Sequence, residues 1–173
     1  VGLMYLTTKY VKRKIALWLD PWSADPQVEG YQFRQGIYSI ASGGLLGRGL
    51  GESGQKYGFG PEPENDMIFT IVVEELGLVG AFLILFLFSM LILRGYWLAL
   101  HARDKFGMLT IVGIITLLAA QVFLNIGVIT GLIPNTGISL PFFSYGGTAL
   151  MIQLGEMGMV LSISRQIPAP RKD

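Results

Sequence analysis

The sequence predicts an all-α fold: a polytopic membrane helix bundle of about three spans plus an N-terminal stub, with a long extracytoplasmic loop that contains short amphipathic helices. Three observations predict it. Of the 173 residues, 51% are hydrophobic and 14% are charged, against about 25% charged in an ordinary soluble domain. Glycine is abundant, at 23 residues. Two long runs contain almost no ionisable side chain and are long enough to cross a bilayer.

Composition also excludes several classes of function. Thirteen Lys and Arg against twelve Asp and Glu give a formal charge of +1, so no net field attracts nucleic acid, and we expect no nucleic-acid partner. The absence of cysteine excludes disulfides, thiolate metal sites and Cys nucleophiles. Because His101 is the single histidine, a Ser-His-Asp triad would have to use it.

Residues 1–66 are expected to hold the end of a preceding span and then the long extracytoplasmic loop. Residues 1–6 form a short apolar stub without an initiator Met, which we interpret as the end of a helix that begins outside this chain. Apolar residues recur at helical spacing in 9–19 and 31–42, the pattern of short amphipathic helices on a bilayer surface. Asp-Pro pairs between the two segments are typical of turns.

The first complete span is predicted at 67–93, where Glu74 and Glu75 are the ionisable residues. At about 1.5 Å per residue this run can cross a hydrocarbon core of roughly 30 Å. The basic and aromatic stretch that follows is typical of a membrane interface, and we expect it to form a cytoplasmic loop at 94–107.

A second span is predicted at 108–133, where Pro134 ends the apolar run. After an extracytoplasmic loop at 134–147, a third span is predicted at 148–164. This third run is shorter and contains Gln153 and Glu156, so it needs support from neighbouring helices.

Orientation follows from the basic residues of the short connections. The loop 94–107 and the tail 165–173 each carry an excess of Lys and Arg over Asp and Glu. Two spans separate them, so they share one side, and the positive-inside rule makes that side cytoplasmic. The loops 1–66 and 134–147 then share the outer face, and we expect the chemistry to take place there.

Glycines are densest in the stretch GGLLGRGLGESGQK at 43–56. It lacks the GxxxxGK[ST] order of a P-loop and follows no strand, so we expect no nucleotide cofactor. One interpretation is a tight, close-packed turn against the membrane. The other is that Arg48 and Lys56 hold an anionic phosphate. The pattern leaves both open.

Asp66 lies on the outer side, immediately before the first complete span. Aspartate is a preferred N-cap, and its charge is stabilised at the positive end of a helix by about 0.3 to 1 kcal/mol. The functional interpretation is a general base at the bilayer surface. The helix dipole lowers the pKa of such a carboxyl and weakens it as a base, so partial desolvation would have to offset this effect.

Three carboxylates fall inside the predicted spans: Glu74, Glu75 and Glu156. An unpartnered carboxylate in a membrane is costly, which makes each a candidate for function. The alternative is hydrogen bonding to polar residues of neighbouring helices, or to basic residues outside this chain. The polar candidates are Gln121, Asn125 and Gln153.

The stretch PFFSYGG at 141–147 has two interpretations. It is either an aromatic anchor with a turn or the rim of a substrate groove, and the pattern does not separate them.

Several motifs in order resemble the SEDS family, which holds the cell-shape, elongation, division and sporulation proteins RodA, FtsW and SpoVE. The similarity runs from about residue 10 to residue 166. The motifs that carry it are the glycine run ending in Gln55-Lys56, the segment from Pro61-Glu62 to Asp66, Glu74-Glu75-Leu76-Gly77, and the closing signature LIPNTGISLPFFSYGG at 132–147.

This resemblance implies a ten-span, multi-pass protein of the bacterial cytoplasmic membrane. It would be a peptidoglycan glycosyltransferase that polymerises lipid II into glycan strands at the outer face during division, elongation or sporulation. Its partners would be lipid II, a class B penicillin-binding protein and other divisome or elongasome membrane proteins. The alternatives are a flippase for lipid-linked sugars and a non-enzymatic scaffold for a penicillin-binding protein.

The family's essential outer-loop aspartate falls on Asp66. In that role Asp66 would take the proton from the 4-hydroxyl of the acceptor sugar, while undecaprenyl pyrophosphate leaves from the anomeric carbon. Residues expected to contact phosphate or glycan, or to line the groove, are Gln32, Arg34, Arg48, Gln55, Lys56, Glu62, Ser144, Tyr145 and Gly146.

The chain departs from the family next to this aspartate. Relatives commonly read LPExHTDF where this chain reads GPEPENDM at 60–67. Repulsion from Glu64 would raise the pKa of Asp66 and strengthen it as a base. Alternatively, Glu64 and Asp66 would help to bind a divalent cation, Mg or Mn, near the pyrophosphate. Both are hypotheses.

Overall fold

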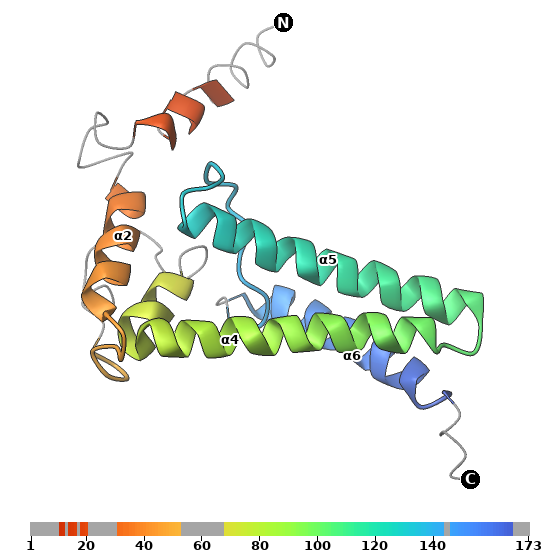
Figure 1. The fold of residues 1–173 in the computed structure, drawn as a ribbon. Coiled ribbons are helices and arrows are strands. Elements are labelled where there is room, and N and C mark those ends of the chain that lie inside the picture. The colour runs from red at the N-terminus through yellow and green to blue at the C-terminus, as the bar shows by residue number, and fades with distance from the viewer. Residues whose placement is uncertain are drawn as a thin grey trace, which may run out of the picture.

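The computed structural model describes residues 11–12, 14–16, 18–20, 31–52, 68–143 and 146–167. Within these residues the chain is helical and contains no strand, which confirms the predicted all-α class. Residues 11–19 are helical wherever they are described. The longer helices run in the order α2 (Tyr31–Gly43), α4 (Ile68–Leu100), α5 (Lys105–Ile129) and α6 (Gly147–Ser164) (Figure 1).

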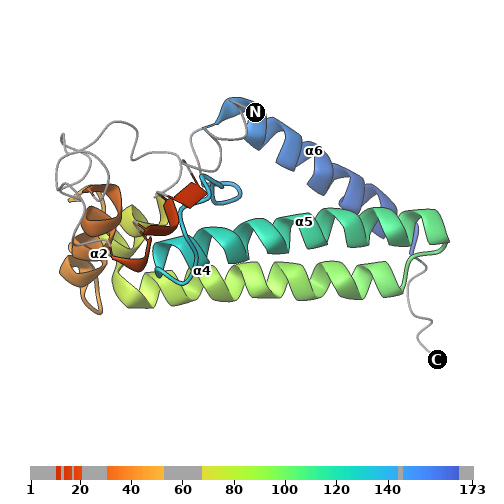
Figure 2. The same ribbon diagram turned by 90° about the horizontal axis from the view of Figure 1, so that it is seen from above.

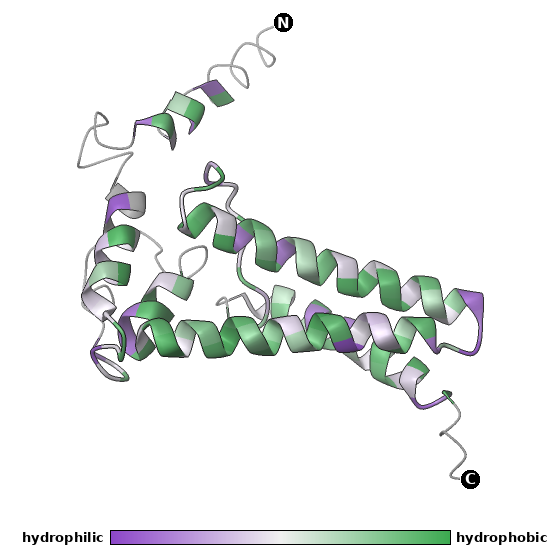
Figure 3. Ribbon diagram, viewed as in Figure 1, coloured by the Kyte–Doolittle hydropathy of each residue, from purple (hydrophilic) through white to green (hydrophobic). Residues whose placement is uncertain are grey.

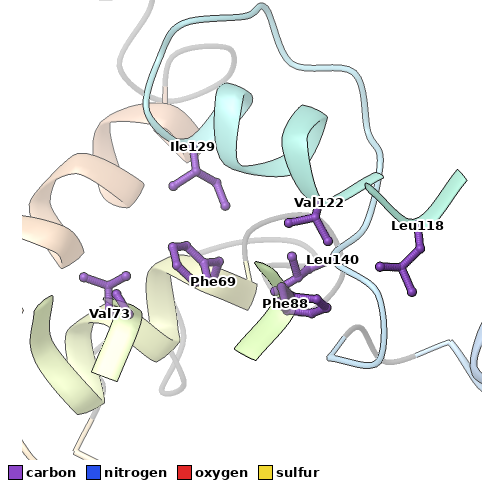
Figure 4. Packing of buried hydrophobic residues seen from close by; sticks show 8 residues of the cluster. Phe69, Val73, Phe88, Leu118, Val122, Ile129 and Leu140 are labelled. Atoms are coloured by element: carbon purple, nitrogen blue, oxygen red, sulfur yellow. The ribbon is translucent and has the colours of Figure 1, made fainter. Parts of the chain in front are cut away.

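Helices α4 and α5 form an antiparallel pair that lies side by side in both views (Figures 1 and 2). Their shared core includes Phe69 and Phe88 from α4, Val122 and Ile129 from α5, and Leu140 from the loop that follows α5 (Figure 4). These side chains are between 1% and 7% exposed. Burial of apolar side chains therefore holds this end of the pair together.

Helix α6 packs against the opposite end of the pair through its C-terminal turns. Val160 of α6 lies in a second core cluster with Ala99 of α4 and Ile111 of α5. Figure 2 shows α6 diverging from α5 toward the N-terminal end of α6. The outer half of α6 consequently exposes apolar residues such as Met151.

The outward faces of the helices are apolar, as Figure 3 shows for α4. Phe82, Phe86 and Leu93 of α4 and Phe123 of α5 are each between 63% and 71% exposed. Three helices, α4, α5 and α6, are long and apolar enough to cross a membrane. A surface of this kind suits lipid rather than water, so the chain is part of a membrane protein.

Helix α4 continues seven residues past the predicted end of the first span, to Leu100. The guanidinium of Arg94 lies over the Trp97 ring at 4.1 Å. The His101 ring stacks on the same Trp97 ring, with 4.2 Å between the two ring centroids. Basic and aromatic side chains of this kind suit a membrane interface, so the helix extends through the interface instead of ending at it.

Helix α5 is shifted toward the N-terminus relative to the predicted span at 108–133. It begins at Lys105 because the Asp104 carboxylate caps it by accepting a hydrogen bond from the Gly107 N–H at 3.1 Å. It ends at Ile129 because Gly131 adopts a φ of 76°, the left-handed conformation that terminates helices. The apolar residues at 130–133 therefore belong to a loop.

Helix α2 crosses the end of the α4–α5 pair instead of running along it (Figure 1). Its Ser39 is 4% exposed, and its Ile40 packs against the core of the pair. The amphipathic helix predicted at 31–42 is thus present as Tyr31–Gly43, and its place on a bilayer surface stays a prediction.

Candidate functional site

Helix α4 is broken at Gly77, whose φ of 70° and ψ of −173° are not helical. In a regular helix the N–H groups of Leu78 and Val79 would donate to the carbonyls of Glu74 and Glu75, four residues earlier. The break separates these two donors from these two acceptors. Buried backbone groups need replacement partners, above all in a membrane.

The glycine loop at 43–49 supplies the replacement partners by entering the break. Its peptide groups stand between each separated donor and acceptor, so two helical hydrogen bonds are replaced by four. The four bonds are Arg48 N–H to Glu74 O (3.0 Å), Gly49 N–H to Glu75 O (3.1 Å), Leu78 N–H to Gly44 O (3.0 Å) and Val79 N–H to Leu45 O (3.2 Å).

Glycine is required where this loop touches the helix. A Cβ on Gly43 would overlap the carbonyl of Val73, and a Cβ on Gly47 would overlap that of Glu75. A Cβ on Gly77 would overlap the Gly47 nitrogen. For Gly43 and Gly47 the structure therefore supports a close-packed turn, and the surface that they pack against is the broken helix. The predicted packing of this stretch against the membrane stays a prediction.

Side chains join the same two segments. The Arg48 guanidinium lies 3.3 Å from Oε1 of Glu74. The Ser42 hydroxyl, which donates to the Ser39 carbonyl at 3.0 Å, lies 3.3 Å from the same Glu74 oxygen. The Glu74 side chain is 3% exposed, whereas the Arg48 side chain is 52% exposed. The buried Glu74 carboxylate, inside a predicted span, is thus paired with the half-exposed guanidinium of Arg48.

This pairing differs from the partners expected for Glu74 on neighbouring helices. Asn125 donates from Nδ2 to the Ile138 carbonyl at 2.8 Å, and Gln153 accepts from the Phe142 N–H at 2.8 Å. Both bonds hold the loop between α5 and α6. The cationic partner of Glu74 is contributed by the glycine loop, and only the fold brings these two segments, 26 residues apart, together.

The closing loop behaves mainly as an anchor in its described part. Leu140 and Pro141 are buried, and the Phe143 ring packs on the Phe88 ring with 6.1 Å between centroids. Gly146 is the N-cap of α6 in an extended conformation. These contacts favour the aromatic anchor over a groove rim for residues 140–143.

Two outer segments meet where the sequence places both on one side of the membrane. Trp18 donates from Nε1 to the Gly131 carbonyl at 2.6 Å, and the Lys14 ammonium donates to the Asn135 carbonyl at 3.0 Å. The Lys14–Asn135 bond therefore brings the predicted loops 1–66 and 134–147 into direct contact. Their place on the outer face stays a prediction.

Several predicted site residues lie outside the described residues. They are Gln55, Lys56, Glu62, Glu64, Asp66, Ser144 and Tyr145, together with the side chain of Gln32. Arg34 lies half-buried on α2. The described part of the chain contains no group of three or more His, Asp or Glu side chains that could hold a metal ion.

The segment that carries Asp66 is bounded on both sides by the loop–helix junction. It leaves the glycine loop after Glu52 and returns at Ile68, nine residues before the break at Gly77. The exposed Arg48 guanidinium belongs to the same junction. The Arg48 guanidinium, held by Glu74 and half exposed, can therefore bind an anionic group such as a phosphate.

The profile of the FtsW/RodA/SpoVE family, described as cell cycle proteins, matches residues 1–168. The chain belongs to this family. Stage V sporulation protein E of Bacillus subtilis is 50% identical over 95% of this chain and 44% of its own length. Peptidoglycan glycosyltransferase MrdB of Escherichia coli is 41% identical over 92% of this chain and 43% of its own length. The chain thus spans less than half of these relatives.

A solved structure supports the same membership. A chain from work described as the structural coordination of polymerization and crosslinking by a peptidoglycan synthase complex aligns with a TM-score of 0.72 at 30% identity. The alignment covers 95% of this chain and 43% of that one. The membrane helix bundle of this chain is therefore the fold of the FtsW/RodA/SpoVE family.

Proposed function

We propose that the protein containing this chain is a peptidoglycan glycosyltransferase that polymerises lipid II into glycan strands at the outer face of the bacterial cytoplasmic membrane. The observation that carries the proposal is the 41% identity, over 92% of the chain, to a relative named as a peptidoglycan glycosyltransferase. Three apolar spans and outer loops in mutual contact suit an enzyme whose substrate is anchored in lipid.

In this proposal Asp66 is the general base. It accepts the proton of the acceptor sugar's 4-hydroxyl as that oxygen bonds to the anomeric carbon of the donor. The bond from that carbon to undecaprenyl pyrophosphate breaks, and the pyrophosphate departs with the electron pair. Asp66 precedes α4 by two residues in the sequence.

Arg48 is proposed to face the departing pyrophosphate. Its guanidinium is half exposed and carries five N–H donors, of which Glu74 engages one end. The remaining donors suit phosphate oxygens, whose charge grows as the pyrophosphate leaves. Lys56 and Arg34 are proposed as further phosphate or glycan contacts, with Gln32, Gln55, Glu62 and residues 144–146 along the groove.

A class B penicillin-binding protein is the proposed partner, with other divisome or elongasome membrane proteins. The support is the similar structure from a complex that coordinates polymerization with crosslinking. Sequential polymer formation and crosslinking at one membrane face would place the two activities in one assembly.

The test is to reconstitute the purified full-length protein into vesicles with fluorescent lipid II and no other polymerase. Glycan strands that are resolved by gel electrophoresis and digested by a muramidase are the expected product. Movement of lipid II between leaflets without strands would make the protein a flippase. Neither polymer nor movement, with the partner still bound, would make it a scaffold, and either result overturns the proposal.

A further inference from the structure

We propose that Glu74 is a positioning residue for strand formation: together with Arg48 it latches the glycine loop into the break of α4. The latch fixes the loop from which the chain enters the segment that carries Asp66. This inference rests on the proposed glycosyltransferase function. Its structural part, the latch itself, stands on contacts within the described chain.

The backbone of this junction has two self-consistent hydrogen-bonded states. In the docked state the loop provides four bonds to Glu74, Glu75, Leu78 and Val79. If the loop leaves, the same four helix groups can pair with one another as in a continuous helix, once Gly77 turns from a φ of 70° to a helical value. The loop groups then bond to water or headgroups, so backbone bonding alone distinguishes the two states weakly.

Side chains decide between these states. The Glu74 carboxylate is 3% exposed and accepts from Arg48, and the Ser42 hydroxyl is shared between this carboxylate and the Ser39 carbonyl. Removal of one partner from a buried ion pair is strongly destabilising because it leaves an uncompensated charge. Undocking of the loop would withdraw Arg48, the cationic partner of this buried carboxylate. The carboxylate at position 74 therefore holds the loop in place.

The latch acts on Asp66 through chain connectivity. The described chain that follows the glycine loop ends at Glu52, and the helical segment that the loop contacts begins at Ile68. On the loop side Gly43 packs on the Val73 carbonyl, and on the helix side Gly77 packs on Gly47. The latch thus holds the chain close to the N-terminal boundary of the segment 53–67. The C-terminal boundary is also held by core packing, because Phe69 lies in the core of α4 and α5 and Ile68 packs against it.

The kinetic test uses four variants of the full-length protein in the lipid II assay. Glu74→Gln is expected to lower kcat about tenfold or more with a smaller change in KM, because the substrate-contacting groups remain. Arg48→Met should lower kcat further, because the buried Glu74 carboxylate then loses its guanidinium partner. The double variant Arg48→Met/Glu74→Gln should have a higher kcat than Arg48→Met, because the buried charge is removed together with that partner. Glu52→Gln, an exposed acid in the same loop, is the matched control and should retain wild-type kcat.

Two kinetic results would overturn the latch. If the double variant has the same kcat as Arg48→Met and both variants lose activity through a raised KM, Arg48 acts only by binding substrate. A wild-type kcat in Glu74→Gln would show that Glu74 is not a positioning residue.

A distance measurement separates failure of the latch from failure of the proposed function. The 173 residues contain no cysteine. In full-length protein freed of any other cysteines, single cysteines for spin labels can therefore be introduced at Leu46 of the loop and Phe86 of α4, which are both exposed. One narrow distance distribution is expected for the wild type and a broad or two-peaked one for Glu74→Gln. An unchanged narrow distribution in Glu74→Gln would refute the latch, whether or not strands are made.

Discussion

Gly47 and Gly77 lie with their backbones in direct contact, although thirty residues separate them in the chain. Gly47 belongs to the loop and has a φ of 79°, and Gly77 interrupts α4 with a φ of 70°. Neither position has room for a Cβ atom. The contact allows the loop to enter the helix, because any side chain would hold the two backbones apart.

Alanine at either glycine should destabilise the protein. Gly77→Ala forces an L-residue into a conformation that is essentially restricted to glycine, at a cost of about 1–3 kcal/mol, and adds a clash with Gly47. Gly47→Ala adds a clash with the Glu75 carbonyl. Thermal unfolding in detergent should show a lower midpoint for both variants. Gly113→Ala, a helical position with no described atom within 4 Å of the new Cβ, should leave the midpoint unchanged or raise it. Equal midpoints for all three variants would refute the packing.

Asn125 should prove more important for stability than its position on an apolar helix suggests. Its side chain is 1% exposed, and its Nδ2 donates to the Ile138 carbonyl. Asn125→Leu keeps the volume but leaves that carbonyl without this donor, at a cost of about 1–3 kcal/mol. Denaturant or thermal unfolding should show the loss. Thr116→Val removes an exposed hydroxyl that bonds to Tyr96, and it should cost less; the reverse order would contradict the role of Asn125.

Gln153 should protect one specific amide of the closing loop. Its Oε1 accepts from the Phe142 N–H at 2.8 Å, at a residue held with a φ of 65°. Gln153→Leu should therefore speed hydrogen–deuterium exchange in peptides that contain residue 142. Gln153→Glu keeps an oxygen acceptor of the same shape and should retain most of the protection. Fast exchange in the wild type would show that this bond does not hold the loop.

The two hypotheses for Glu64 separate in a titration with Mg or Mn ions. If Glu64 helps to hold a divalent cation, Glu64→Gln should need more added ion to reach the same polymerisation rate. If it acts by repulsion on Asp66, Glu64→Gln should shift the rising limb of the pH–rate profile of kcat to lower pH, because the pKa of the base falls. The ion requirement should then be unchanged. A variant with wild-type behaviour in both titrations would rule out both roles.

The helices were predictable because lipid exposure leaves a local signature. The apolar runs that contain Phe82 to Leu93 and Ile111 to Val122 predict spanning helices without reference to any distant residue. Helix ends were less predictable. The start of α5 depends on the Asp104 cap and its end on Gly131, and each is a short polar or glycine signal inside a longer apolar trend.

The junction could not be predicted from the sequence, because its parts are distant. Gly77 inside an apolar run looks like a tolerated helix glycine until Gly47 is placed against it. Glu74 was correctly singled out as a carboxylate that needs a partner, yet its pairing with Arg48 depends on the loop entering the break. Asp66 rests on the family motif and on its place beside α4, and its catalytic role stays a proposal.

The most direct test of the central claim is single-turnover strand formation by full-length Asp66→Asn, with lipid II affinity measured on the same sample. Asparagine keeps the size of the side chain and can cap a helix, so fold and binding should survive while the base is lost. The expected result is wild-type affinity with strand formation reduced by at least 100-fold. Strands formed at the wild-type rate would contradict the account.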